Sequence, residues 1–192
     1  MSLNIPVILG TERDGRQSEH LARFVVARLQ ARTGMHAVLI DPGLHHFGNL
    51  RTRAMDVEQA PNPEVRSFIE QMHAADGFVI VTPEYNFSFP GALKNLLDVT
   101  FKPWNKKPFG LVGCGGISGG MRAIDSLRQV VSGLGAVCVP AHVPVQFIGK
   151  TFGPDGPLVE AEAWTKRVDS FLDEVLWYAE ALKAARAGPV QA

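Results

Sequence analysis

The chain has little cysteine, no surplus of charge and no long apolar run, and each shortage excludes a class of protein. Its two cysteines, Cys114 and Cys138, cannot form a disulfide framework, and both fall in apolar runs typical of strands. Nineteen Lys and Arg balance nineteen Asp and Glu, so no long-range field would concentrate nucleic acid or an anionic membrane. No apolar run approaches the roughly 18 residues that a membrane helix needs, and the N-terminus lacks a signal-peptide pattern. We therefore expect a cytoplasmic protein with no nucleic-acid or membrane partner.

What remains is the composition of an ordinary globular protein. Hydrophobic residues make up 46% of the chain and charged residues 20%, which is far from the composition of disordered or fibrous proteins. A length of 192 residues fits one core. We expect a single domain over residues 1–192.

Short apolar runs alternate with amphipathic segments along the whole chain. The periodicity predicts five strands and five helices. The strands are expected at 5–9, 37–40, 78–81, 109–113 and 136–139, and the helices from Ser18 to about Gly34, at 65–72, 90–98 and 121–132, and from about Trp164 to Leu182. Strands that are apolar on both faces need helices on both sides, so the pattern favours an α/β three-layer fold around a parallel sheet with right-handed crossovers. Two stretches, Asp41 to Pro63 and His142 to Pro157, are expected to be irregular.

Ligands of such sheets bind beyond the carboxyl ends of the strands, which directs attention to three turns. The first turn, after Leu9, places Thr11, Arg13, Arg16, Gln17 and Ser18 ahead of a helix. A helix N-terminus, hydroxyl groups and guanidinium groups together suit a phosphate. A helix capped by Ser18, with both arginines in water, is an equally good interpretation of these residues alone.

The second and third turns are suited to a flat, hydrogen-bonding ring. After Val81 the chain reads Thr82-Pro83-Glu84-Tyr85-Asn86, a rigid polar segment whose backbone could face a heterocycle. From Gly113 to Gly120 it reads GCGGISGG, which lets the backbone come very close to a ligand. A plain turn before a helix, with Tyr85 covering apolar surface, is the alternative for the second turn.

Other site patterns in the chain are incomplete. The glycine turn has Ser118 at the third glycine position of a dinucleotide-binding fingerprint, and no ribose-binding acid follows the next strand. Neither Ser88 nor Ser118 lies in a G-x-S-x-G elbow, and His, Cys and carboxylate side chains show no metal-ligand spacing. We expect no metal site and no catalytic side chain, because the three turns fit a cofactor that carries its own chemistry.

These residues resemble the NADPH-dependent FMN reductase family, which includes flavodoxin-like quinone, azo-dye and chromate reductases. Its G-[ST]-x-R turn stands here as Gly10 to Arg13, with the extension Gly15-Arg16-Gln17-Ser18, and its longer signature is present without a gap as PEYNFSFPGALKNLLD, residues 83–98. Cys114 departs from the aromatic or small polar residue often found in the third loop. The resemblance covers about Val7 to Val139 and implies a flavodoxin-like sheet of order 2-1-3-4-5.

The resemblance also implies a cofactor, an activity and an assembly. FMN would be bound, and NADPH or NADH would donate hydride that passes through FMN to a quinone, azo, metal-oxyanion or free-flavin acceptor. By position, the phosphate would be held by Thr11, Arg13, Gln17 and Ser18, with Arg16 as an additional candidate, and the flavin ring would be lined by Pro83, Glu84, Tyr85, Asn86, Gly115, Gly116 and Ser118. The family implies a homodimer or homotetramer. An FMN electron carrier that does not oxidise nicotinamide is the alternative, although such carriers are typically acidic and this chain is neutral.

Overall fold

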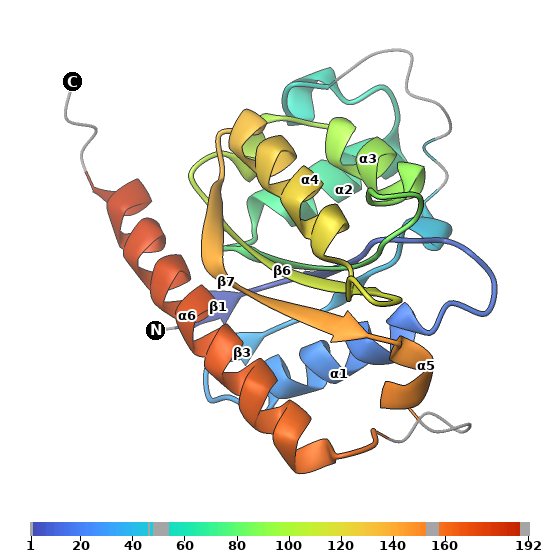
Figure 1. The fold of residues 1–192 in the computed structure, drawn as a ribbon. Coiled ribbons are helices and arrows are strands. Elements are labelled where there is room, and N and C mark those ends of the chain that lie inside the picture. The colour runs from blue at the N-terminus through green and yellow to red at the C-terminus, as the bar shows by residue number, and fades with distance from the viewer. Residues whose placement is uncertain (1, 46, 48–53, 153–157, 189–192) are drawn as a thin grey trace.

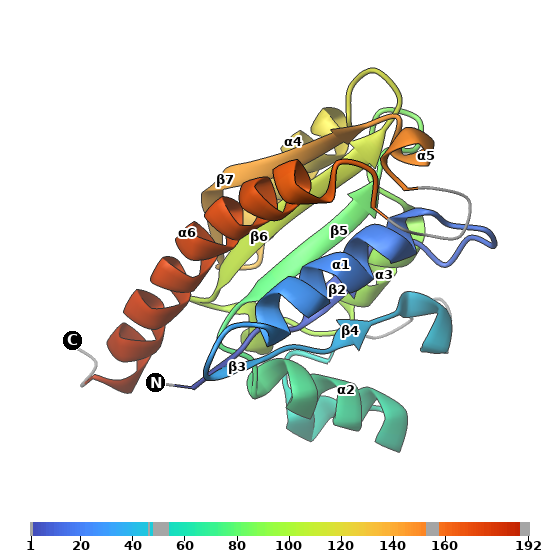
Figure 2. The same ribbon diagram turned by 90° about the horizontal axis from the view of Figure 1, so that it is seen from below.

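The centre of the molecule is a five-stranded parallel sheet. The structure is a computed structural model that describes residues 2–45, 47, 54–152 and 158–188. In space the strands follow the order β4 (Leu39–Ile40), β2 (Val7–Leu9), β5 (Phe78–Pro83), β6 (Pro108–Gly115) and β7 (Val137–Gln146), and all neighbours are parallel. Figure 1 shows the whole fold, and Figure 2 labels these five strands. Counted along the chain this order is 2-1-3-4-5, so the predicted fold class is confirmed.

A short parallel pair of strands precedes β2 and β4, with one member ahead of each. β1 (Leu3–Asn4) pairs with β3 (Met35–His36). Pro6 has no N–H to donate to a ladder, and the regular strand is interrupted there. The backbone bonds nevertheless continue on either side, with Ile5 N–H donating to the His36 carbonyl and Val7 N–H to the Val38 carbonyl, both at 2.8 Å. The segment from Leu3 to Leu9 therefore stays paired with the segment from Met35 to Ile40 in spite of the interruption.

Helices cover both faces of the sheet, as its apolar strands require. α1 (Ser18–Gln30) and α6 (Ala161–Ala187) pack on one face, and α2 (Pro63–His73), α3 (Gly91–Asp98) and α4 (Met121–Gly133) on the other (Figure 2). The side chains of β2 divide between the two layers, since Val7 and Leu9 join the core under α1 and α6 while Ile8 joins the opposite core. This is the period-two alternation of a strand.

Close contact between α6 and the sheet depends on one glycine. A Cβ atom at Gly110 would lie 2.6 Å from both the Phe171 ring and a Val175 methyl group, so only glycine lets the helix approach the strand this closely. Burial of an aliphatic or aromatic side chain contributes roughly 1.5–3 kcal/mol. Phe171, Leu172 and Val175 are all buried in this contact, which makes α6 an integral layer of the fold.

The last strand is longer than the sequence pattern predicts, and the expectation of irregular backbone from His142 is wrong for its first part. β7 continues to Gln146, with a register shift opposite Phe109 and Leu111. Pro140 and Pro144 within the strand have no N–H to donate to a ladder. β7 is the edge of the sheet, however, where a residue without an N–H is tolerated.

Short helical turns occupy parts of both stretches that were expected to be irregular. They are η1 (Pro42–Leu44), η2 (Val57–Gln59) and α5 (Ile148–Thr151). A further turn, η3 (Lys102–Trp104), precedes β6. Residues 46, 48–53 and 153–157 of those stretches lie outside the described residues.

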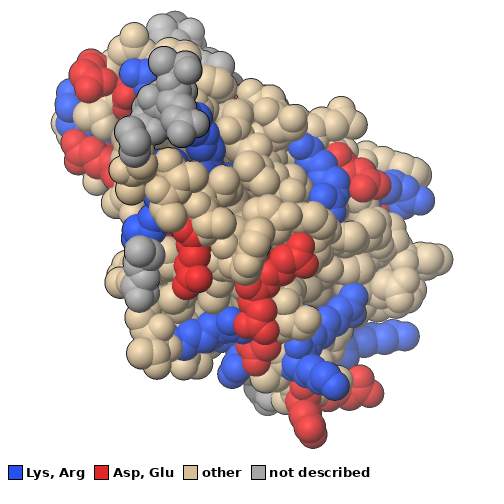
Figure 3. Space-filling view, turned by 90° about the vertical axis from the view of Figure 1, so that its left-hand side faces the viewer, with Lys and Arg blue, Asp and Glu red and all other residues tan. Residues whose placement is uncertain are grey.

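The surface carries charges of both signs close together. Figure 3 shows Lys and Arg interspersed with Asp and Glu over one face of the molecule. One ion pair joins two helices, since Arg28 of α1 contacts Asp169 of α6 at 2.7 Å. No helix in the described ranges is long and apolar enough to cross a membrane.

Candidate functional site

The carboxyl ends of β2, β5 and β6 bring the three predicted turns together around one pocket. The pocket has a volume of about 280 Å³. Its lining includes eight of the predicted residues: Arg13, Arg16, Gln17, Ser18, Pro83, Glu84, Tyr85 and Gly115. Asp14, Gly15, Cys114 and Ile148 also line it and were not predicted, whereas Thr11, Asn86, Gly116 and Ser118 lie outside its lining.

The pocket lining includes a buried hydroxyl group, that of Ser18, with no partner in the described part of the chain. Ser18 is the first residue of α1 and is 3% exposed, and its Oγ has no hydrogen-bond partner among the described residues. The N-cap position belongs to Gln17, which makes no side-chain capping bond, so the interpretation of Ser18 as N-cap is wrong. A buried polar group normally finds a partner. A buried, unpartnered hydroxyl at a helix N-terminus is suited to an anionic ligand group.

Thr11, Arg13 and Tyr85 connect the first turn to the second. The Thr11 and Tyr85 hydroxyl oxygens lie 3.1 Å apart, and Thr11 Oγ1 also accepts from the Arg13 N–H at 3.3 Å. The Arg13 guanidinium lies over the Tyr85 ring, 4.0 Å from its centroid. Arg13 is exposed, so its guanidinium stands at the pocket mouth with its donors accessible.

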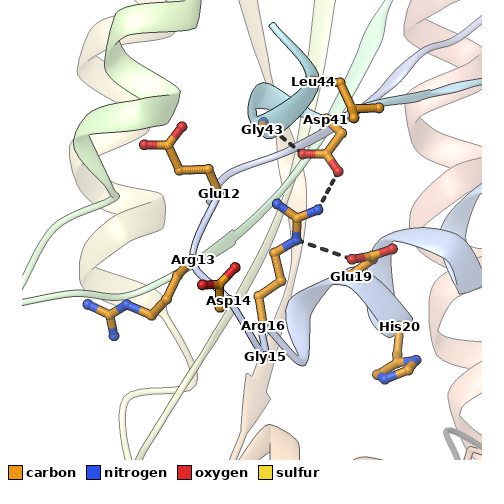
Figure 4. A pocket seen from close by; sticks show the side chains of 10 residues that line it. All are labelled: Glu12, Arg13, Asp14, Gly15, Arg16, Glu19, His20, Asp41, Gly43 and Leu44. Atoms are coloured by element: carbon orange, nitrogen blue, oxygen red, sulfur yellow. Dashed lines mark hydrogen bonds and ion pairs between the residues drawn. The ribbon is translucent and has the colours of Figure 1, made fainter. Parts of the chain in front are cut away.

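Arg16 has a different environment from Arg13. Its guanidinium forms ion pairs with Glu19 and Asp41 (Figure 4). It also donates a hydrogen bond to the Thr11 carbonyl. Burial opposes its charge, but Glu19 and Asp41 outweigh that effect and raise the pKa of Arg16. Arg16, Glu19 and Asp41 also line a second pocket of about 480 Å³. Gln17 is exposed, and its side-chain oxygen lies beside Gly149 of α5.

The second turn is a tight reversal at the end of β5. Tyr85 and Ser88 exchange two backbone hydrogen bonds, of 2.8 and 3.0 Å. Asn86 and Phe87 between them have φ values of 47° and 70°, as a type I′ turn requires. Asn adopts this left-handed region readily, whereas Phe does so at a cost. Pro83 belongs to β5, so the strand extends two residues further than predicted.

The third turn returns to the start of α4 through two glycines with positive φ. β6 includes Cys114 and Gly115, which leaves Gly116 to Gly120 as the turn. Gly119 and Gly120 have φ values of 62° and 85°, and a Cβ at Gly120 would lie 2.4 Å from the Cys114 nitrogen. At Gly116, by contrast, an added Cβ would meet nothing within 4 Å. The glycines therefore let the turn fold back on β6 and leave open space beside Gly116.

Glu84 joins the second turn to the third. Its carboxylate accepts hydrogen bonds from Ser118 Oγ at 2.8 Å and from the N–H and Nη1 of Arg122, both at 3.0 Å. Burial disfavours its charge, but the bonds from Ser118 and Arg122 outweigh this effect and lower the pKa of the Glu84 carboxyl. Sequence reasoning chose Glu84 and Ser118 as ring contacts and did not identify Arg122. The side chains of Glu84 and Ser118 contact each other, and this contact fixes the second turn relative to the third.

The pocket contains a thiol that is not activated as a nucleophile. The Cys114 thiol lies at its wall, and burial raises the pKa of this thiol to about 12, so it stays protonated at neutral pH. Among the described residues no group of three or more His, Cys, Asp or Glu side chains could hold a metal ion. An anion site at Ser18, an arginine at the mouth and glycine-lined backbone together fit a phosphorylated planar cofactor such as FMN.

The chain is similar in sequence to known proteins. The model of the family described as NADPH-dependent FMN reductase matches residues 3–149. A quinone reductase of Pseudomonas putida is 30% identical over 153 residues, which cover 76% of this chain and 77% of that protein. A probable NADPH:quinone oxidoreductase 2 of Oryza sativa subsp. japonica is 34% identical over 128 residues, or 62% of this chain. The match spans 61% of that protein's own length.

The fold also has counterparts among solved structures. FerB, a flavoenzyme NAD(P)H:(acceptor) oxidoreductase from Paracoccus denitrificans, superposes with a TM-score of 0.71 at 23% identity. The superposition covers 92% of this chain and 98% of that one. At this level of identity the likeness concerns the arrangement of the sheet and its helices.

Proposed function

Because the chain belongs to the NADPH-dependent FMN reductase family, as its motifs predicted, we propose that it is an NAD(P)H-dependent FMN oxidoreductase that reduces a small-molecule acceptor. FMN, when bound, would supply the redox chemistry between the nicotinamide donor and the acceptor. The observation that carries the proposal is the pocket in which the buried Ser18 hydroxyl and the two ring turns meet. The protein contributes binding, orientation and electrostatics.

The first turn would hold the FMN phosphate. The Ser18 hydroxyl lies at the N-terminus of α1, where the helix dipole favours an anion. Arg13 adds a positive charge at the pocket mouth, and the Thr11 hydroxyl is positioned by Tyr85 and the Arg13 backbone. Gln17 is exposed beside the same turn and remains a predicted phosphate contact.

The second and third turns would hold the flavin ring through their backbone. Pro83, Glu84, Tyr85 and Gly115 line the pocket, and we propose that the backbone from Glu84 to Asn86 and at Gly115 and Gly116 faces the ring. Backbone donors near the ring would stabilise negative charge that develops on reduction. The carboxylate of Glu84 and the hydroxyl of Ser118 keep these turns together.

The surroundings of the pocket favour a flat, apolar acceptor such as a quinone. Phe87, Ile117 and Phe147 are large apolar side chains that are 69%, 81% and 47% exposed, and they stand on the turns that follow β5, β6 and β7. Exposed apolar groups around a polar site are typical of binding surfaces. The named relatives from Pseudomonas putida and Oryza sativa are quinone reductases or oxidoreductases, which supports the same class.

The steady-state rate of NAD(P)H oxidation distinguishes a reductase from an FMN electron carrier that does not oxidise nicotinamide. The purified protein is loaded with FMN, and oxidation of NADPH or NADH is followed with a soluble benzoquinone as acceptor. We expect oxidation of at least one donor that depends on both FMN and quinone. A protein that binds FMN but oxidises neither donor would instead be the carrier.

The proposal also covers the oligomeric state of the protein and its place in the cell. We propose that residues 1–192 form one FMN-binding domain that associates as a homodimer or homotetramer in the cytoplasm. The free thiols of Cys114 and Cys138 suit a reducing compartment. Light scattering coupled to gel filtration measures the mass, and a monomer would contradict the assembly.

A further inference from the structure

Each of the three guanidinium nitrogens of Arg16 is bonded to the protein itself. Nε donates to Glu19 Oε2 at 3.2 Å, Nη1 to the Thr11 carbonyl at 3.0 Å, and Nη2 to Asp41 Oδ2. The side chain is only 16% exposed. The guanidinium therefore links three segments: the first turn, the start of α1 and the loop that follows β4 (Figure 4).

Asp41, the partner of Arg16 in the loop after β4, is itself held in place. It follows β4 directly, is 8% exposed, and its Oδ1 accepts from the Gly43 N–H at 2.9 Å. A Cβ at Gly43 would lie 3.3 Å from both Arg16 Nη1 and Asp41 Oδ1, so the backbone closes tightly around the pair. Removing one partner of such a largely buried pair leaves the other without compensation.

Arg13 lies on the same turn but is held differently. Its guanidinium contacts the Tyr85 ring, and no ion pair joins it to the described part of the chain. It is exposed at the mouth of the pocket. Of the two arginines, Arg13 is thus available to an incoming phosphate, while Arg16 is already engaged.

We infer that Arg16 and Asp41 are a positioning pair that sets the shape of the phosphate turn, and that Arg16 does not contact the FMN phosphate. This inference rests on the proposed function, because it concerns how the same site binds FMN. By fixing the Thr11 carbonyl and Glu19, the pair holds the turn and the start of α1 in place on either side of Arg13. The charge of the phosphate is then met by Arg13 and the N-terminus of α1.

The Asp41→Asn variant separates positioning from direct contact, because the two roles predict effects of opposite sign. If Arg16 turned to the phosphate on binding, loss of the Asp41 charge would release it, and FMN would bind equally well or more tightly. A positioning pair predicts about tenfold weaker FMN binding. Arg16→Gln should weaken binding to a similar extent, and the double variant should be no weaker than either single variant, because both changes break the same contact.

The readout is the FMN dissociation constant of the apoprotein, from quenching of flavin fluorescence. Riboflavin, which lacks the phosphate, is titrated in parallel and should bind each variant within about twofold of the unmodified protein, because the ring turns are unchanged. The salt dependence of FMN binding gives a second readout. Arg13→Gln should reduce it, whereas Arg16→Gln and Asp41→Asn should retain it, since neither removes a charge that contacts the ligand.

Arg23→Gln is the matched control. Arg23 also pairs with Glu19, at 2.7 Å, but its side chain is 65% exposed and it lies a turn further along α1. This variant makes the same change in charge as Arg16→Gln without touching Thr11 or Asp41. Its FMN affinity should stay within about twofold of the unmodified protein, as for an exposed ion pair.

Three outcomes would overturn the inference. They are undiminished FMN binding by Asp41→Asn, additive losses in the double variant, and loss of riboflavin binding along with FMN binding, which would mean that the pair supports the whole domain. Failure of the unmodified apoprotein to bind FMN is a separate result, and it would refute the proposed function itself.

Discussion

Replacement of Glu84 by Gln should loosen the third turn from the second. The Glu84 side chain is 9% exposed and accepts from Ser118 Oγ, the Arg122 N–H and the Arg122 guanidinium. A glutamine is similar in size but carries no charge, and only one of its two terminal atoms can accept a hydrogen bond. The NH₂ group of the glutamine cannot accept a hydrogen bond. At least one of the groups that donate to Glu84, on Ser118 or Arg122, therefore loses its acceptor.

The expected loss can be estimated bond by bond. The hydrogen bonds from Ser118 Oγ and the Arg122 N–H contribute about 1 kcal/mol each. The Arg122 side chain is 50% exposed, so solvent screening reduces its ion pair to about 0.5 kcal/mol or less. The total is about 2 kcal/mol, and the loss in Glu84→Gln is at most this, because the amide oxygen still accepts at one of the two positions. In a domain of this size each 1 kcal/mol lowers Tm by roughly 2–4 °C, so Glu84→Gln should lower Tm by up to about 8 °C.

The pH dependence of this effect has a definite sign. The contacts lower the pKa of the Glu84 carboxyl in the folded protein below its ordinary value of 4.5. The unfolded state therefore binds the proton more readily, and stability from Glu84 is fully present above pH 4.5 and lost as the pH falls through the lowered pKa. The difference in Tm between the unmodified protein and Glu84→Gln should be constant near neutral pH and shrink in acid.

Differential scanning calorimetry of the apoproteins measures both effects. Glu70→Gln is the control, because Glu70 is exposed on α2 and the described residues show no side-chain bond to it. Equal Tm values for Glu84→Gln and Glu70→Gln at neutral pH would refute the bridging role. A difference that grows in acid would contradict the assigned direction of the pKa shift.

Three further substitutions test other parts of the pocket. Arg13→Ala should weaken FMN binding by roughly 1.5–3 kcal/mol if its guanidinium bonds to the phosphate, and an unchanged dissociation constant would exclude that contact. Ser18→Ala removes a buried hydroxyl without a partner in the described chain, so the apoprotein should keep or gain stability while FMN binds about tenfold more weakly; lower apoprotein stability would mean that the hydroxyl is already satisfied. Gly120→Ala places a Cβ 2.4 Å from the Cys114 nitrogen at a φ of 85°, and should abolish FMN binding in a titration. FMN bound normally by this variant would show that the turn can rearrange.

Sequence patterns predicted the layers of the fold well, because the signals are strong and local. Runs such as Phe78-Val79-Ile80-Val81 are apolar at every position and are buried at every position, as in a strand covered on both faces. The end of β7 was missed because its prolines are compatible with pairing only at a sheet edge. Edge position is a property of the assembled sheet and has no local signal.

The structure brings the three predicted turns together at one pocket, whereas the roles of individual side chains were harder to predict. Arg13 and Arg16 are three residues apart in one polar segment, and nothing in the sequence distinguishes the exposed side chain from the engaged one. The difference comes from Asp41, which reaches the turn from the neighbouring strand. Glu84 and Ser118 likewise contact each other across 34 positions of sequence, a pairing that single-sequence reasoning does not reveal.

Reduction of the bound flavin without oxygen is the most direct test of the proposed activity. The FMN-loaded protein is mixed anaerobically with NADPH and separately with NADH, and the visible absorbance of the flavin is followed in a stopped-flow instrument. We expect rapid bleaching by at least one donor, and this result also names the donor. Bound FMN that keeps its absorbance with both donors, or an apoprotein that binds no FMN, would contradict the proposed function.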